Sequence, residues 1–248
     1  MAIHPIQTLR GFLSPFEIGW MGYDGTGDGR VFEVRPNYSA DPRVVVENIR
    51  ELFRRVLEVI PETRNHRWLA GSSVYSKSLG GHIHFGAKSS SDIVLALDVL
   101  LAPLVALIEV ESDRRTRLGK NYGHLGAAEP KPYGFEYRTP ASWLWAPGLA
   151  IAVLALGQGI VQDGLNRCLP WQAIRTLEDR YVRRDDAAVT TRVLDLAVAR
   201  TSLKDIWTAV GRIGTAHRFY PEITYLKTLT EGGRVWTNAE DMKARWWL

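Results

Sequence analysis

Two histidines separated by one residue, His82 and His84, lie in the segment SLGGHIHFG, with glycines on both sides. Residues i and i+2 of a β-strand point to the same face, so both imidazoles are expected on one side, with Ile83 and Phe85 on the other. Imidazole nitrogen binds borderline divalent metals. The pair alone fits a metal site and an ordinary polar strand face equally well, so other segments must decide.

Two further segments show the same alternation. In RVFEVRP, Glu33 and Arg35 alternate with apolar residues, and in GFEYRTP, Glu136 and Arg138 do the same. Carboxylate oxygens suit a hard divalent cation, and arginine makes bidentate contacts with phosphate or carboxylate groups. Each pair taken singly also fits a solvated strand face. Three pairs together favour one site that binds a metal and a nucleotide phosphate chain.

Other folds that use a His-x-His step fit less well. A cupin needs a glutamate shortly after the pair, and the following FGAKSSS has none. An amidohydrolase barrel needs two more histidines, a lysine and an aspartate on alternating β and α units. The later histidines here are only His124 and His217, and the last third of the chain has a helical pattern.

The elements that must position these pairs are strands followed by helices. Residues 11–36 have the pattern of two strands joined by a Gly/Asp turn, and the His-x-His and Glu-x-Arg segments are predicted to be strands. Asp41 is the expected N-cap of the first helix, and Pro103 is expected to bend the second. Helical periodicity covers these ranges: 42–60, 91–111, 147–161, 171–183, 187–199 and 202–213. In the last third of the chain, residues 223–229 have the pattern of a strand.

The composition is that of a globular protein of 248 residues, 46% hydrophobic and 23% charged. The single cysteine, Cys168, excludes an internal disulfide and a cysteine-based zinc site, which suits a reducing cytoplasm. Residues 92–111 and 146–161 are apolar, but the first run contains charges and a proline and the second is too short to span a membrane. Both are expected to be buried helices, and no membrane partner is expected.

The net charge of +4 fits both a nucleic-acid binder and an enzyme for anionic substrates. No basic stripe with interleaved aromatic residues is present, and the arginines of residues 175–218 are expected to solvate helix faces. Nucleic acid is therefore not the favoured partner. We expect a core of strands and helices over residues 1–165 and a helical C-terminal part, 166–248, packed on it in one domain.

The blocks GGHIHFG, KPYGFEYRTPASWL and YDGTGDGRVFEVRPNYSADP resemble the phage-type carboxylate–amine ligase family, which is related to glutamine synthetase and glutamate–cysteine ligase. The likeness covers about residues 11–150. It implies an α+β fold with a glutamine synthetase-like antiparallel sheet, helices on one face and a helical C-terminal part. It also implies that ATP converts a carboxylate to an acyl phosphate, which an amine attacks, with Mg²⁺ bridging the phosphates.

The resemblance also implies metal ligands. Glu33, His82 and Glu136 match metal-binding positions of the family. The family's first strand usually carries a further glutamate, but Pro15 stands at that position here. Glu17 lies two residues further on, so on a strand it would share that face and substitute in part. If it does not, the chain is an inactive relative that acts as a binding or structural protein, for example in a virus.

Further residues match positions that contact phosphate. His84 matches a position near the nucleotide phosphates, and Arg138 matches the arginine that contacts the transferred phosphoryl group or the carboxylate. Arg35 is expected to line the same site. Either Arg115 or Arg117 resembles another phosphate-binding arginine, and the register between them stays open. The implied partners are small-molecule or peptide carboxylates and amines, with a homo-oligomer as one expectation, in the cytoplasm of a host cell if a phage encodes the chain.

Overall fold

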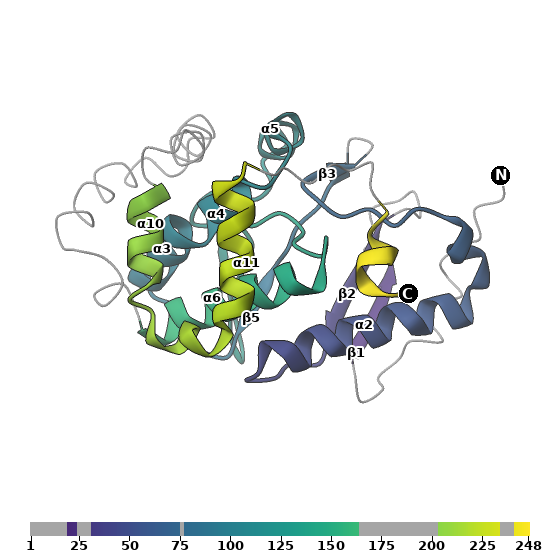
Figure 1. The fold of residues 1–248 in the computed structure, drawn as a ribbon, viewed down its shortest axis with the longest axis horizontal. Coiled ribbons are helices and arrows are strands. Elements are labelled where there is room, and N and C mark those ends of the chain that lie inside the picture. Colours follow the sequence, from purple (N-terminus) through teal and green to yellow (C-terminus); the bar gives the residue numbers. More distant parts are fainter. Residues whose placement is uncertain (1–18, 24–30, 75–76, 164–202, 234–240) are drawn as a thin grey trace. The chain divides into compact units, whose positions relative to one another are not determined.

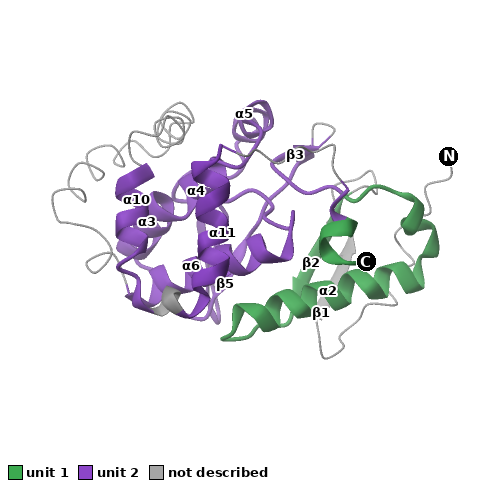
Figure 2. Cartoon of the chain, viewed as in Figure 1, with its two compact units in different colours: residues 1–68, 243–248 green, residues 69–242 purple. Residues whose placement is uncertain are grey.

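The computed structural model describes residues 19–23, 31–74, 77–163, 203–233 and 241–248 (Figure 1). The chain forms two compact units (Figure 2). Unit 1 comprises residues 1–68 and 243–248, and unit 2 comprises residues 69–242. The expected boundary near residue 165 falls outside the described ranges, so that division of the chain stays a prediction.

Unit 1 contains the predicted hairpin and the first predicted helix. Strand β1 (Gly19–Tyr23) pairs antiparallel with β2 (Phe32–Pro36), and the turn between them lies outside the described residues. Helix α2 (Pro42–Val59) starts at the predicted N-cap, because the Asp41 carboxylate accepts a hydrogen bond of 3.0 Å from the Arg43 backbone. A short 3₁₀ helix, η2 (Pro61–Asn65), follows.

The last residues of the chain complete unit 1. The 3₁₀ helix η4 (Met242–Trp246) ends at Trp246, whose ring is fully buried and packs edge-on against Phe53 of α2 at 5.0 Å. The Lys243 ammonium donates hydrogen bonds to the carbonyls of Arg64, at 2.6 Å, and His66. The C-terminal segment therefore supplies both core and polar contacts to a unit built mainly from the first 68 residues.

Unit 2 is built on a three-stranded antiparallel sheet with the order β5-β7-β6. Its strands are β5 (Ile83–Phe85), β6 (Ala128–Lys131) and β7 (Gly134–Tyr137). One face is apolar, and the Phe85 and Phe135 rings stack on it with centroids 5.0 Å apart. Helices α3 (Ser91–Leu100) and α6 (Pro147–Asp163) contribute to its cover. A Cβ added at Gly157 of α6 would lie 3.2 Å from the Phe85 ring.

The second predicted helix is divided near Pro103, as expected. Helix α3 ends at Leu100, and α4 (Ala102–Ala106) restarts with the proline in its first turn, because proline cannot donate the backbone hydrogen bond of a helix interior. The predicted helices at 147–161 and 202–213 correspond to α6 and α10 (Leu203–Val210). Those at 171–183 and 187–199 lie outside the described residues. Unit 2 also contains β3 (Ser73–Val74), β4 (Lys77–Ser78), α5 (Glu111–Gly119) and η3 (Gly214–Phe219).

The strand predicted at 223–229 is wrong. This segment lies within helix α11 (Tyr220–Glu231), which packs along α6 (Figure 1). Its buried side chains Ile223, Leu226 and Leu229 recur every third residue, which fits a helix face and not the alternation of a strand. Pro221 in the first turn favours helix initiation. In the part of the chain that the structure describes, no helix combines the length and hydrophobicity needed to cross a membrane.

Candidate active site

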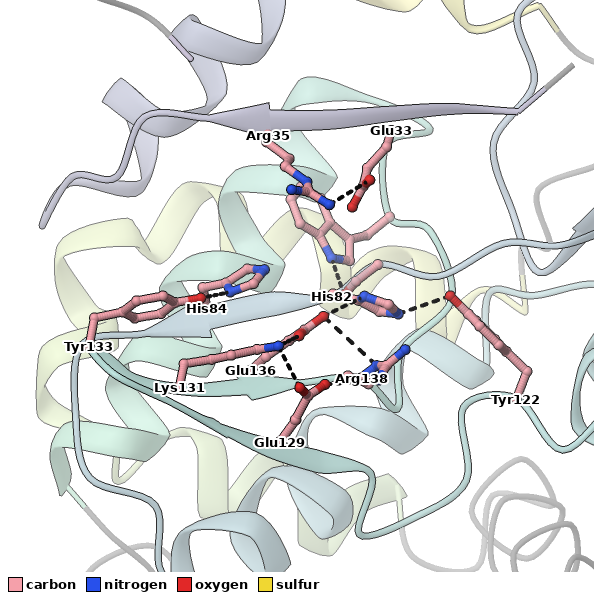
Figure 3. Close-up of polar contacts among 12 residues, drawn as sticks. Glu33, Arg35, His82, His84, Tyr122, Glu129, Lys131, Tyr133, Glu136 and Arg138 are labelled. Carbon is pink, nitrogen blue, oxygen red and sulfur yellow. Dashed lines mark hydrogen bonds and ion pairs between the residues drawn. The ribbon is translucent and has the colours of Figure 1, made fainter. Parts of the chain in front are cut away.

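The second face of the β5-β7-β6 sheet is polar and carries two of the three predicted pairs. His84 lies opposite Glu136 on the neighbouring strand, and Glu129 of β6 lies opposite Glu136 on its other side. Ile83 and Phe85 are buried on the far face, as the alternation predicted. The sheet therefore brings His82, His84, Glu136 and Arg138 onto one surface (Figure 3).

Glu136 is at the centre of this surface, and only 9% of its side chain is exposed. Its Oε1 lies 2.7 Å from Nδ1 of His82 and 3.8 Å from Nε of Arg138, and its Oε2 lies 2.9 Å from Nζ of Lys131. Burial alone would raise the pKa of the Glu136 carboxyl. The hydrogen bond from Lys131 and the charges of His82, His84 and Lys131 outweigh burial, so the pKa is lowered and the carboxylate stays ionised.

A second carboxylate, Glu129, shares the same cations. Its Oε1 lies 2.7 Å from Nζ of Lys131, and its Oε2 lies 3.0 Å from NH1 of Arg138. The hydrogen bond with Lys131 lowers the pKa of Glu129, and the hydrogen bonds with Glu129 and Glu136 raise the pKa of Lys131. Two carboxylates and two cations thus alternate across the surface.

Two tyrosines contact the histidine pair. The Tyr122 hydroxyl lies 3.0 Å from Nε2 of His82, and the two rings stack with centroids 5.9 Å apart. The Tyr133 hydroxyl hydrogen-bonds Nδ1 of His84. In the neutral form of His82, Nδ1 donates to Glu136 and Nε2 accepts from Tyr122. The imidazole is therefore fixed between a carboxylate and a phenol, which sets its tautomer.

Sequence reasoning missed Tyr122, Glu129, Lys131 and Tyr133, because the glycines and prolines of residues 119–134 are typical of a loop. The structure places Glu129 and Lys131 on β6, an edge strand of the sheet. Proline is excluded from central strands but is tolerated at an edge, so Pro130 did not rule out a strand here. The alternation of Glu129 and Lys131 around that proline was the available signal.

The glycines around the histidine pair allow close approach of the backbone. A Cβ on Gly81 would lie 2.2 Å from the Ala141 carbonyl oxygen, inside any real contact. The Gly81 amide donates to the Pro140 carbonyl at 2.9 Å, and its own carbonyl accepts from the Trp143 indole at 2.9 Å. Gly86, at the other end of β5, has open space where a Cβ would lie.

Gly81→Ala is expected to destabilise the protein by about 1–3 kcal/mol, because the new methyl group must displace the Ala141 backbone. Gly86→Ala is the matched control and should change the free energy of unfolding by less than about 0.5 kcal/mol. Urea denaturation followed by circular dichroism measures both. If the two variants were equally stable, the backbone around Ala141 would have moved to make room for the methyl group at little cost in free energy.

A buried carboxylate supports the sheet from the side of its apolar face. Asp98 of α3 is 1% exposed. It accepts hydrogen bonds of 2.6 Å from the Tyr137 hydroxyl and 2.6 Å from the Gly126 amide, and one of 3.3 Å from the Thr139 hydroxyl. Gly126 lies just before β6, and Tyr137 lies between Glu136 and Arg138 in the sequence. Asp98 therefore ties the two strands that carry the carboxylates to one helix.

The other predicted arginines have different surroundings. Arg117 is 1% exposed and donates to the Thr139 carbonyl at 3.0 Å, with the buried Glu109 at 3.6 Å. Arg115 is exposed on α5 and pairs with Glu111 at 2.7 Å. A role of either arginine in phosphate binding stays a prediction. The contacts of Arg117 with the protein interior show that it helps to hold the segment after Arg138.

The third predicted pair lies in unit 1. Glu33 and Arg35 of β2 form an ion pair of 2.8 Å, with 65% of the arginine side chain exposed. Their side chains lie on one side of the strand, as predicted, and pair with each other. Glu17, the remaining predicted metal ligand, lies outside the described residues.

The donors on the polar face of unit 2 are chemically suited to a cation. Carboxylate oxygens suit Mg²⁺, Ca²⁺ and Mn²⁺, and imidazole nitrogen suits borderline divalent ions. The two carboxylates already bracket a positive charge, because Lys131 lies within 2.9 Å of both. Within the described ranges, no three His, Cys, Asp or Glu side chains come together as a ready metal centre. The residues present fit a site in which a cation is shared between two carboxylates.

The sequence of this chain matches a model of a known protein family. The family model described as phage phiEco32-like COOH.NH2 ligase-type 2 matches residues 19–248, which is most of the chain. The chain belongs to this family. Comparisons with curated proteins and with solved structures give no match. The match extends well beyond residue 150, where the resemblance seen in the sequence ended, so the C-terminal helices are part of the ligase family's common sequence.

The family name describes a ligase that joins a carboxyl group to an amine. The mixture of helices with small antiparallel sheets agrees with the predicted α+β class. In this ligase-family chain the described strands form a three-stranded sheet and two two-stranded sheets. Two of the three predicted polar pairs share the three-stranded sheet, and the Glu33–Arg35 pair belongs to a two-stranded one.

Proposed function

We propose that the protein is an ATP- and Mg²⁺-dependent carboxylate–amine ligase that forms an amide bond through an acyl phosphate. The observation that carries the proposal is the polar face of the β5-β7-β6 sheet, where Glu136 contacts an imidazole, an ammonium and a guanidinium group. Membership of the ligase family supports the reaction class. The substrates are proposed to be a small-molecule or peptide carboxylate and an amine.

The reaction has two steps with simple atom balance. A carboxylate oxygen of the substrate attacks the γ-phosphorus of ATP, and ADP leaves. The amine nitrogen then attacks the carbonyl carbon, phosphate leaves, and the nitrogen loses a proton. Both steps build negative charge on the phosphate oxygens of the leaving group, so fixed positive groups in a partly dry site lower the barrier.

The residues of unit 2 divide these tasks. Arg138, with 42% of its side chain exposed, can present its guanidinium to the transferred phosphoryl group or the substrate carboxylate. The exposed His84, held by Tyr133, is proposed to contact the nucleotide phosphates. His82 and Glu136 are proposed metal ligands, and Mg²⁺ bound there would neutralise phosphate charge. Glu33, Glu17, Arg35, Arg115 and Arg117 keep the roles that the resemblance implies.

Isothermal titration with ATP plus Mg²⁺ tests the site. Wild-type protein is expected to bind, and His82→Ala and Glu136→Ala are expected to weaken binding about 10- to 100-fold. Glu231→Gln, on the exposed face of α11, is the control and should bind like the wild type. Equal binding by all variants, or no binding by the wild type, would reject the site.

ADP release measured with mixtures of amino acids, polyamines and peptides tests the reaction itself. A folded protein that binds ATP but shows no turnover with any of these substrates would favour the alternative function. The chain would then be an inactive relative of the ligases, with a binding or structural role. Pro15, at the position where the family usually has a glutamate, is the sequence feature that motivates this alternative.

A further inference from the structure

Lys131 has an unusual position among the groups of the polar face. Its ammonium lies 2.7 Å from Oε1 of Glu129 and 2.9 Å from Oε2 of Glu136, so it bridges two carboxylates on neighbouring strands. Only 24% of its side chain is exposed. Figure 3 shows the side chain running over the sheet toward both carboxylates. Lys131 therefore occupies the place where these two carboxylates jointly attract a cation.

The strand register explains how the side chain reaches this place. Lys131 is the last residue of β6 and lies opposite Gly134, which has no side chain. Its diagonal neighbour on β7 is Glu136, within reach of a long side chain. Gly134 has a φ of +154°, and a Cβ there would lie 2.0 Å from the Phe85 carbonyl oxygen. The backbone thus keeps the position opposite Lys131 clear.

We propose that Lys131 is a tethered cation that occupies the Glu129–Glu136 carboxylate pair and competes with divalent metal for it. The proposal deepens the proposed function and rests on it, and it adds Glu129 and Lys131 to the residues that control metal binding. A tethered group has a high effective concentration, so free metal must overcome a competitor that is always present. Metal binding and displacement of the ammonium are then one coupled event.

Charge balance indicates when this exchange is favoured. With Lys131 and Arg138 in place, the two cations neutralise Glu129 and Glu136. A divalent ion that enters alone adds two uncompensated positive charges and displaces the ammonium. A phosphate chain that arrives with the ion supplies negative charge and gives the displaced ammonium a new partner. The protein should therefore bind metal weakly alone and more tightly with a nucleotide, by linkage.

The test is Mn²⁺ binding by the whole protein without nucleotide or substrate, followed by calorimetry. Lys131→Met removes the charge and keeps the length of the side chain, and it should bind Mn²⁺ at least about 10-fold more tightly than the wild type. Lys131→Arg keeps the charge and should bind as weakly as the wild type. Lys227→Met, which removes an exposed charge on α11, should behave like the wild type. Unchanged or weaker Mn²⁺ binding by Lys131→Met overturns the proposal.

A second measurement uses the wild-type protein and does not depend on the folding of a variant. Acetylation of lysines, read by mass spectrometry, should label Lys131 several-fold faster at saturating Mn²⁺, because metal releases the ammonium from both carboxylates. Labelling of Lys227 should not change. Equal labelling of Lys131 with and without Mn²⁺ overturns the proposal. Neither measurement needs ATP or turnover, so failure of the proposed ligase reaction would be seen separately.

Discussion

Asp98→Ala is expected to destabilise unit 2 by about 3 kcal/mol, because it leaves at least two buried donors without an acceptor at about 1–3 kcal/mol each. The donors are the Tyr137 hydroxyl and the Gly126 amide, both 2.6 Å from the carboxylate. Urea denaturation measures the loss. The same change should also reduce ATP binding, because Tyr137 lies between Glu136 and Arg138 in the sequence.

Two further variants separate the effect of Asp98 from a general effect on α3. Asp98→Asn keeps an oxygen for Tyr137 but presents an amide group to the Gly126 N–H, so an intermediate loss of stability is expected. Asp92→Ala, on the exposed first turn of the same helix, should cost less than about 1 kcal/mol. If Asp98→Ala proved as stable as Asp92→Ala, water would have replaced the buried carboxylate as the hydrogen-bond acceptor.

The parts of the site that could be predicted are those that depend on local periodicity. The alternation in GGHIHFG and GFEYRTP is enough to place Ile83 and Phe135 in the core and His84 and Glu136 on the other face. Helix α2 was predictable for a similar reason, since Asp41 provides a cap that operates within three residues. None of these features needs a partner that is distant in the sequence.

The parts that could not be predicted depend on contacts between distant segments. Tyr122 contacts His82, and Tyr133 contacts His84 from 49 residues away, and no local pattern encodes these pairs. Strand β6 has the composition of a loop, and its pairing with β7 decides its conformation. Helix α11 contains β-branched and aromatic residues, which intrinsically prefer strands. Its packing against α6 stabilises the helix instead.

Trp246→Ala is the second variant with a large expected effect, a loss of about 3–5 kcal/mol in the stability of unit 1. The Trp246 ring is fully buried, and its centroid is 5.0 Å from that of Phe53, which in turn packs edge-on against Trp68 at 5.5 Å. Truncation removes the end of this aromatic row and leaves a cavity that the rigid helix α2 cannot fill. Limited proteolysis with mass spectrometry shows which unit opens.

The neighbouring tryptophan provides a matched control for the same substitution. Trp247 is 70% exposed, and the Arg50 guanidinium lies over its ring, 4.7 Å from the ring centroid. A contact of this kind at an exposed site contributes about 0.5–1 kcal/mol, so Trp247→Ala should be nearly as stable as the wild type. If both variants lose the same small amount, the last six residues are not part of the core of unit 1. If only Trp246→Ala opens unit 1, the end of the chain stabilises the unit that carries Glu33 and Arg35.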